Sequence, residues 1–259
     1  GATTEQMEKM RDAAISWGEK TVYTATEAGK ALYYMGLAGW SSEQSVAGLG
    51  SVLNLAAAGN LDLGRSSDIV TDAMTAMGYK AGEFTNGIEN TTYFTNALAA
   101  AMSNSNTDVD QLGEAFKYVA PLAGSLKTGV NDLSLALGLM ANVGVKSSQA
   151  GTGLRQALKQ MIAPTKATQK VMDEYGISLF DAQGNAKSMR DFLQSLRDEF
   201  GNTGVSIKDA NGNIKEGEQI LQEYADKLPI SQQEKLNAIV ELFGVRALPG
   251  MLGIIDQSQ

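Results

Sequence analysis

Helical runs that end at a glycine constrain this chain more than any other sequence feature. The clearest pair meets within residues 141–155, where one apolar run ends at Gly144 and a second follows. Ala150 and Gly151 lie in the first turns of that second run, which Ser147 is predicted to cap. Small residues at such a place let two helices approach closely. No nucleophile or metal ligand accompanies this turn, so we interpret it as a packing device.

Other runs carry apolar residues three and four apart after a capping signal. Capping-box spacings at Ser41 and Ser231 predict two helix starts, and Thr107 is predicted to cap a third helix. The predicted ends of these three helices are Gly59, Gly244 and Pro121, and a fourth run over residues 126–140 leads to Gly144. The sequence therefore predicts a mainly α fold, a compact multi-helix domain of antiparallel helical hairpins.

Two helical segments resemble each other. Residues 37–39 read Leu-Ala-Gly, and the same triplet recurs at residues 122–124, which is 85 positions later (122 − 37 = 85). One interpretation is a duplicated helical hairpin. The alternative is that helices rich in alanine and glycine resemble one another by chance.

Residues 176–228 have a different pattern. Two D-A-x-G-N turns begin at Asp181 and Asp209, each after a short β-branched or apolar run, with Gly184 and Gly212 placed for positive φ. This predicts one or two small β-hairpins within residues 176–216, which can pair in one sheet. The predicted organisation is a helical core domain at 1–175, a β-hairpin and helix subdomain at 176–228, and a carboxyl-terminal helix at 229–259 that packs back on the core.

Composition excludes most enzymatic chemistry. The 259 residues include no cysteine and no histidine, which excludes thiol nucleophiles, serine–histidine relays and imidazole or thiolate metal sites. The net charge of −8 disfavours nucleic-acid and anionic-membrane binding. The longest apolar run, residues 133–145, is shorter than the ~20 residues of a transmembrane helix. The first residues lack a starting methionine and read as the trimmed start of a longer chain.

Two chemical interpretations fail on spacing. Asp209, Asn211 and Asn213 are spaced like calcium ligands, but Ile220 stands where the bidentate glutamate belongs, so a solvated turn is preferred. The glycines around Thr152 lack the lysine and hydroxyl of a phosphate loop. No catalytic, cofactor-binding or metal-binding residue is predicted.

Acidic pairs and methionines receive structural interpretations. The pairs at residues 173–174 and 198–199 are adjacent in sequence and point to different sides of a helix, so we interpret them as surface charges rather than hydrolase acids. The eleven methionines, Met7 and Met10 among them, follow the apolar stripes and are predicted to fill the core, with an adaptable interaction surface as the alternative.

The order and spacing of these motifs from about residue 21 to residue 246 resemble the core region of phage tail tape measure proteins. The segment at 204–228 departs from that pattern and reads as an insertion. The motif residues that carry the resemblance, predicted to be structural, are Gly39, Gly59, Gly144, Ala150, Gly151, Thr152, Leu154, Arg155, Pro164, Gly176, Phe243, Gly244 and Arg246.

The resemblance implies a virion structural protein that lies in the tail lumen and is present in the host cytoplasm during assembly. Such a protein determines tail length and supports tail tube assembly and DNA ejection. The implied partners are the tail tube protein, tail assembly chaperones, tail-tip proteins and further copies of the full-length protein, with no cofactor, no specific nucleic-acid binding and no transmembrane segment in this fragment. The alternatives are a domain delivered at the tail tip, either a cell-wall hydrolase or a membrane-perturbing module, and a scaffold of a prophage-derived injection machine.

Overall fold

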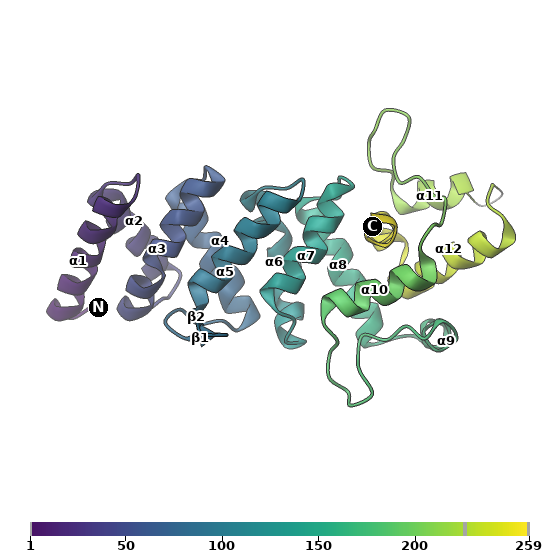
Figure 1. Cartoon of the computed structure of the whole chain (residues 1–259), viewed down its shortest axis with the longest axis horizontal. Coiled ribbons are helices and arrows are strands. Elements are labelled where there is room, and N and C mark those ends of the chain that lie inside the picture. The colour runs from purple at the N-terminus through teal and green to yellow at the C-terminus, as the bar shows by residue number, and fades with distance from the viewer. Residues whose placement is uncertain (1, 225–226, 258–259) are drawn as a thin grey trace.

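Two layers of helices stack along one axis (Figure 1). This computed structural model describes residues 2–224 and 227–257. The odd layer contains α1 (Thr4–Lys20), α3 (Ser42–Gly59), α5 (Asn90–Asn104) and α7 (Val130–Asn142), and the even layer contains α2 (Ala25–Leu37), α4 (Leu63–Met77), α6 (Val109–Ser125) and α8 (Ser147–Ile162). The predicted mainly α fold of helical hairpins is confirmed, and because four hairpins stand in a row the body is elongated.

The hairpins recur at a near-regular interval. Even-layer helices begin at residues 25, 63, 109 and 147, so the intervals are 38, 46 and 38 residues (63 − 25, 109 − 63 and 147 − 109). The longer middle interval contains the antiparallel pair β1 (Phe84–Thr85) and β2 (Ile88–Glu89). The matching triplets lie at the end of α2 (37–39) and in the last turns of α6 (122–124), two hairpins apart. The structure therefore favours duplication over chance resemblance.

The carboxyl-terminal helices cover one end of the stack. They are α9 (Lys166–Tyr175), α10 (Met189–Phe200), α11 (Gly217–Tyr224), α12 (Ile230–Phe243), the 3₁₀ turn η1 (Val245–Ala247) and α13 (Leu248–Gln257). Helices α10 and α13 pack against α7, and α12 and α13 pack against α8. The predicted division into domains stays a prediction, and residues 225–226 of the predicted insertion lie outside the described residues.

Side-chain caps start several helices as expected. The predicted capping box at Ser41 is confirmed, and Thr3 and Thr24 form the same reciprocal bonds at α1 and α2. Thr107 does not cap α6, because the carboxylate of Asp108 accepts the N–H of Gln111 instead. Each box satisfies two backbone N–H groups that have no partner within the helix.

Two other predicted starts are wrong. Ser147 is already the first residue of α8, with φ of 51°, and no side chain caps that helix. Helix α12 begins at Ile230 directly after Pro229, which places Ser231 inside the helix and leaves no capping box. A proline's fixed φ suits the start of a helix, and this decides the boundary here.

Helix ends follow the glycines more closely than the prolines. Helix α3 ends at Gly59 as predicted, although the left-handed residue that stops it is Asn60, with φ of 50°. Gly144 and Gly244 have φ of 101° and 79°, values that side chains rarely tolerate. Pro121 does not end α6, which continues to Ser125.

The predicted β-hairpins at 176–216 are reduced to two tight turns. Each holds a single antiparallel bridge, Phe180 with Ala186 and Lys208 with Ile214, and the two turns project from opposite sides of the molecule (Figure 1). They are therefore not paired in one sheet. The only sheet in the described residues is β1–β2, whose turn at Asn86 and Gly87 the sequence analysis missed.

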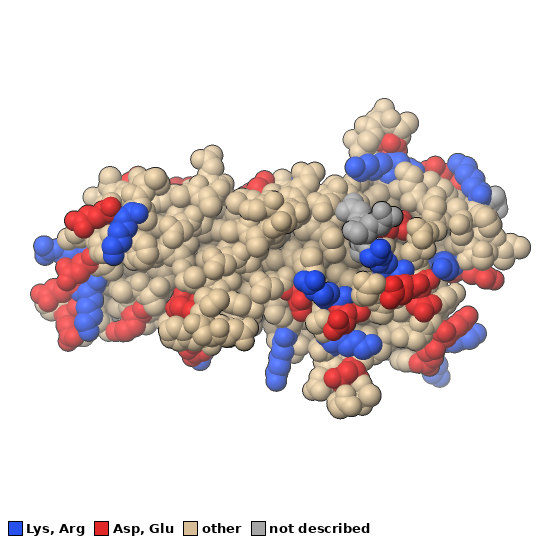
Figure 2. Space-filling view, in the orientation of Figure 1, with Lys and Arg blue, Asp and Glu red and all other residues tan. Residues whose placement is uncertain are grey.

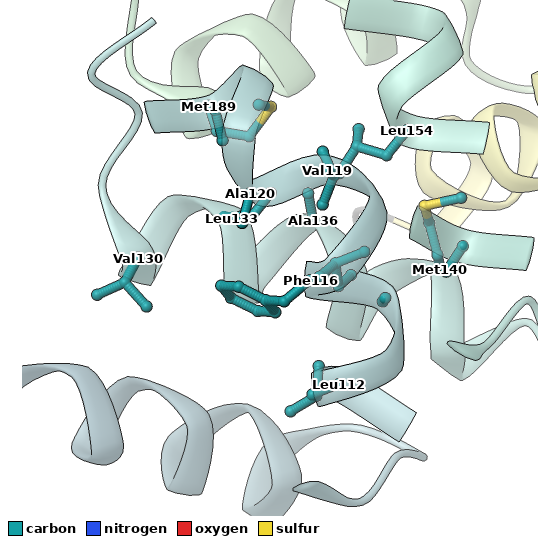
Figure 3. Packing of buried hydrophobic residues seen from close by; sticks show 14 of the residues in the cluster. Leu112, Phe116, Val119, Ala120, Val130, Leu133, Ala136, Met140, Leu154 and Met189 are labelled. Atoms are coloured by element: carbon teal, nitrogen blue, oxygen red, sulfur yellow. The ribbon is translucent and has the colours of Figure 1, made fainter. Parts of the chain in front are cut away.

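Large side chains of one helix rest on small residues of the next. Figure 3 shows Leu112 and Phe116 of α6, Leu133 of α7 and Leu154 of α8 in one core. A Cβ on Gly113 of α6 would lie only 2.5 Å from Cγ1 of Ile69 in α4. The glycines therefore set how closely successive hairpins stack.

Candidate functional site at the junction of helix α8 and the carboxyl-terminal turn

One face of α8 packs tightly against α6. Ala150, Gly151 and Leu154 are buried there. A Cβ on Gly151 would lie 2.2 Å from the carbonyl oxygen of Ala115, and this contact is with backbone rather than with a movable side chain. Any residue larger than glycine would therefore push the two helices apart.

A sharp turn packs against another face of α8. Helices α12 and α13 meet at 107°, and Gly244 between them has φ of 79° and ψ of 155°. Phe243 just before it is fully buried. A Cβ on Gly217 of α11 would lie 1.9 Å from the carbonyl oxygen of Val245, so α11 holds the turn from its other side.

Motif residues that are distant in sequence line one small cleft of about 150 Å³. Helix α8 contributes Thr152, Arg155, Gln156 and Lys159, and the turn contributes Arg246. The three cationic side chains are exposed, and within residues 2–224 and 227–257 none of them has an ion pair or a side-chain hydrogen bond. The cleft therefore presents positive charge on a chain whose net charge is −8.

The chemistry of this cleft suits an anionic group. Guanidinium groups bind carboxylates and phosphates through paired N–H donors, and an ammonium adds a point charge. Neither a carboxylate nor an imidazole lines the cleft, so nothing in its lining neutralises these charges. We call the three cations Arg155, Lys159 and Arg246 the cation cleft.

The remaining motif residues lie elsewhere. Gly39 is in the α2–α3 turn, Gly59 ends α3, and Pro164 and Gly176 flank α9. Gly144 ends α7, where a Cβ would lie 3.2 Å from Cδ1 of Ile214 in the second tight turn. The sequence analysis missed Gln156 and Lys159, although a spacing of one and four residues from Arg155 places them on one side of α8.

The carboxylates of Asp181 and Asp209, in the two tight turns, accept hydrogen bonds from the backbone of their own turns. The carboxylate of Asp209 accepts the N–H groups of Asn211 and Asn213 at 2.8 Å. These hydrogen bonds, the one from Asn213 first, hold the pKa of Asp209 below its usual range, and Asp181 behaves in the same way with Asn185. No group of three acidic side chains in the described residues could hold a metal ion. This geometry favours the turn interpretation over calcium binding.

Helix length and composition were also compared with what a bilayer requires. No single helix of the described chain is long and apolar enough to cross a membrane. Two pairs of successive helices, α3 with α4 and α12 with α13, reach the required length and composition only when each pair is counted together across bends of 119° and 107°.

Comparison with known proteins gives consistent matches. The sequence model of the phage-related minor tail protein family matches residues 11–204. The chain is 31% identical over 256 residues, 99% of its length, to the tape measure protein of Pneumococcus phage Dp-1. It is 24% identical over 195 residues, 75% of its length, to the probable tape measure protein of Escherichia phage P2. These alignments cover 19% and 23% of the two relatives, so the chain spans about a fifth of their length. No solved structure matches the chain.

Proposed function

Because the chain belongs to the phage-related minor tail protein family, we propose that it is the core segment of a tape measure protein, a structural component of a phage tail. The observation that carries this proposal is the 31% identity, over nearly the whole chain, to a protein named as a tape measure protein. In the proposal the whole protein lies in the tail lumen, determines tail length, and supports tube assembly and DNA ejection. This segment supplies a folded helical core and no catalysis.

The distribution of charge supports a place beside passing DNA. Figure 2 shows charged side chains at the two ends of the molecule and few over the middle of the stack. Residues 44–61, which include most of α3, and residues 90–107, which include all of α5, contain no charged residue. Since DNA is held mainly by cations that neutralise its phosphates, a neutral face on an acidic chain releases DNA readily.

The cation cleft supports a contact with an acidic partner. Its three cations have no carboxylate partner among the residues that the structure describes, so an acidic segment of a tail tube, tail-tip or assembly chaperone protein can pair with them without breaking an ion pair seen there. Assembly with such partners takes place in the host cytoplasm before the protein is enclosed in the virion tail.

Sedimentation of the chain with purified tail tube subunits tests the proposal. We expect co-sedimentation, or tube growth that begins sooner, and a weaker effect for Arg155→Glu combined with Arg246→Glu. Lys170→Glu on α9 is the matched control, because Lys170 is equally exposed but lies outside the cleft. A chain that neither binds the subunits nor alters tube growth would contradict an assembly role for this segment.

Activity assays separate this role from delivery at the tail tip. Clearing of purified cell walls, or leakage from liposomes at physiological salt, would contradict a purely structural segment. Strong retention on immobilised duplex DNA would contradict the proposed role of the neutral face.

A further inference from the structure

The uncovered end of the stack carries an open apolar groove of about 460 Å³ between α1 and α2. Met7, Tyr33 and Leu37 line it and are 56%, 63% and 68% exposed. The prediction that methionines fill the core is therefore wrong for Met7. Arg11 is the only charged residue among the side chains that line this groove. We call this surface the end groove.

Inside the stack, each even-layer helix rests on a glycine of the next one. Tyr34 of α2 lies on Gly64 of α4, where a Cβ built on Gly64 would be 3.2 Å from Cζ of Tyr34. Ile69 of α4 lies on Gly113 of α6 in the same way. The backbone of α6 then lies on Gly151 of α8. Three successive interfaces thus place a glycine on the side of the helix that faces the amino-terminal end of the stack.

Helix α2 also has glycines on the side that faces the amino-terminal end of the stack, but no other described helix packs on them. Gly29 and Gly36 are seven residues apart and line the end groove, and in the described part of the chain no heavy atom beyond their own stretch of α2 lies within 4 Å of a Cβ built on either. Residues seven apart lie on one face of a helix. The end groove is therefore the half of such a hairpin–hairpin interface that the carboxyl-terminal hairpin of each pair supplies, without the half that a preceding hairpin supplies.

The sequence of the first hairpin is that of an internal repeat. Residues 3–6 read Thr-Thr-Glu-Gln and residues 41–44 read Ser-Ser-Glu-Gln, which is 38 positions later (41 − 3 = 38) and equals the hairpin interval. Both form capping boxes. In helical repeat proteins the terminal repeat carries a polar outer face. The first hairpin here has charged residues on α1, but the groove between α1 and α2 is lined mainly by apolar residues and glycines.

We infer that the end groove receives one more helical hairpin of the same polypeptide, whose even-layer helix places large apolar side chains over Gly29 and Gly36. The interface would continue the glycine contacts already present between successive even-layer helices. The relatives have ample chain for it, since the aligned region is only 19% and 23% of their length. A second copy cannot extend the stack from head to tail, because α10, α12 and α13 cover α7 and α8 at the other end.

Thiol accessibility tests this inference, because the 259 residues include no cysteine. Leu37→Cys reports on the end groove, and Val22→Cys, at a site 84% exposed in the α1–α2 turn, is the matched control. Each variant is made in the 259-residue chain and in the complete polypeptide, and maleimide labelling of each site is followed by peptide mass spectrometry. We expect similar labelling rates in the short chain, and at least ten-fold slower labelling of the groove thiol alone in the complete polypeptide.

A third variant separates loss of docking from loss of folding. A Cβ at Gly29 meets no neighbouring side chain, so Gly29→Leu should leave the thermal melting of the short chain unchanged or slightly raised, while the groove thiol in the complete polypeptide should become reactive again. Equal labelling of the groove thiol in both chains would overturn the inference. Protection that depends on concentration in the short chain, together with a doubled mass by sedimentation, would assign the groove to a second copy and overturn it as well.

Discussion

Replacing Gly151 with alanine tests the packing of α8 on α6 most directly. The new Cβ would lie 2.2 Å from the carbonyl oxygen of Ala115, whereas ordinary contact begins near 3.4 Å, so the helices must separate by about 1.2 Å (3.4 − 2.2). Overpacking of a core costs ~1–3 kcal/mol, and a clash with backbone belongs at the upper end because no rotamer relieves it. Alanine is intrinsically more favourable than glycine within a helix by ~1 kcal/mol, which offsets part of this cost. We expect the free energy of unfolding to fall by ~1–2 kcal/mol.

The matched control is the same substitution at Gly29 on the end groove. No atom lies within 4 Å of its would-be Cβ, so only helix preference changes and the free energy of unfolding should rise by ~0.5–1 kcal/mol. Urea unfolding followed by far-ultraviolet circular dichroism measures both variants against the parent chain. If Gly151→Ala were stabilised as much as Gly29→Ala, the close approach of α6 and α8 would not be what requires glycine.

Three further predictions concern single positions. Gly144→Val should lower the melting temperature, since a β-branched residue at φ of 101° is strained and its Cβ would press on Ile214. Gly144→Asn should lower the melting temperature less, because asparagine tolerates positive φ better. Equal decreases in melting temperature for the two variants would contradict the strain explanation. Pro121→Ala should raise the free energy of unfolding by ~1–3 kcal/mol in urea denaturation, because it restores a backbone donor inside α6, and a loss would mean that the proline is needed for packing. Carbon-13 NMR titration should give Asp209 a pKa below its ordinary 3.8. The folded pKa is lowered, so this carboxylate stabilises its turn above that pH and loses the contribution as pH falls through the folded pKa; a pKa at or above 3.8 would contradict the turn geometry.

Local signals in the sequence were reliable where one side chain decides the outcome. Ser41 forms its capping box because the Glu-Gln that follows is available and no competitor precedes it. Ser231 fails because the helix already begins at Ile230, directly after Pro229, and Thr107 fails because the carboxylate of the neighbouring Asp108 caps the helix instead. The turn at Asn86 and Gly87 carries the Asn-Gly signal of a tight hairpin, and the sequence analysis could have used it.

The stacked architecture was harder to predict, because it depends on which helical faces meet. The inserted segment that contains β1 and β2 changes the hairpin interval from 38 to 46 residues, and this conceals the repeat. The cation cleft was only partly predictable for a similar reason. Thr152 and Arg155 belong to one motif and Arg246 to another, and only the turn at Gly244 brings them together.

The direction of the helices limits how finely this segment can register length. Helices α1 to α8 lie across the long axis of the stack (Figure 1), so a residue added within one of them widens the body and leaves its length along that axis unchanged. The stack grows only in whole steps, one hairpin of about 38 residues at a time. A helix that runs along the axis, by contrast, gains ~1.5 Å with every residue. Under the proposed function, fine adjustment of tail length would therefore fall to parts of the polypeptide that run along the tail axis, and this segment would contribute one fixed length.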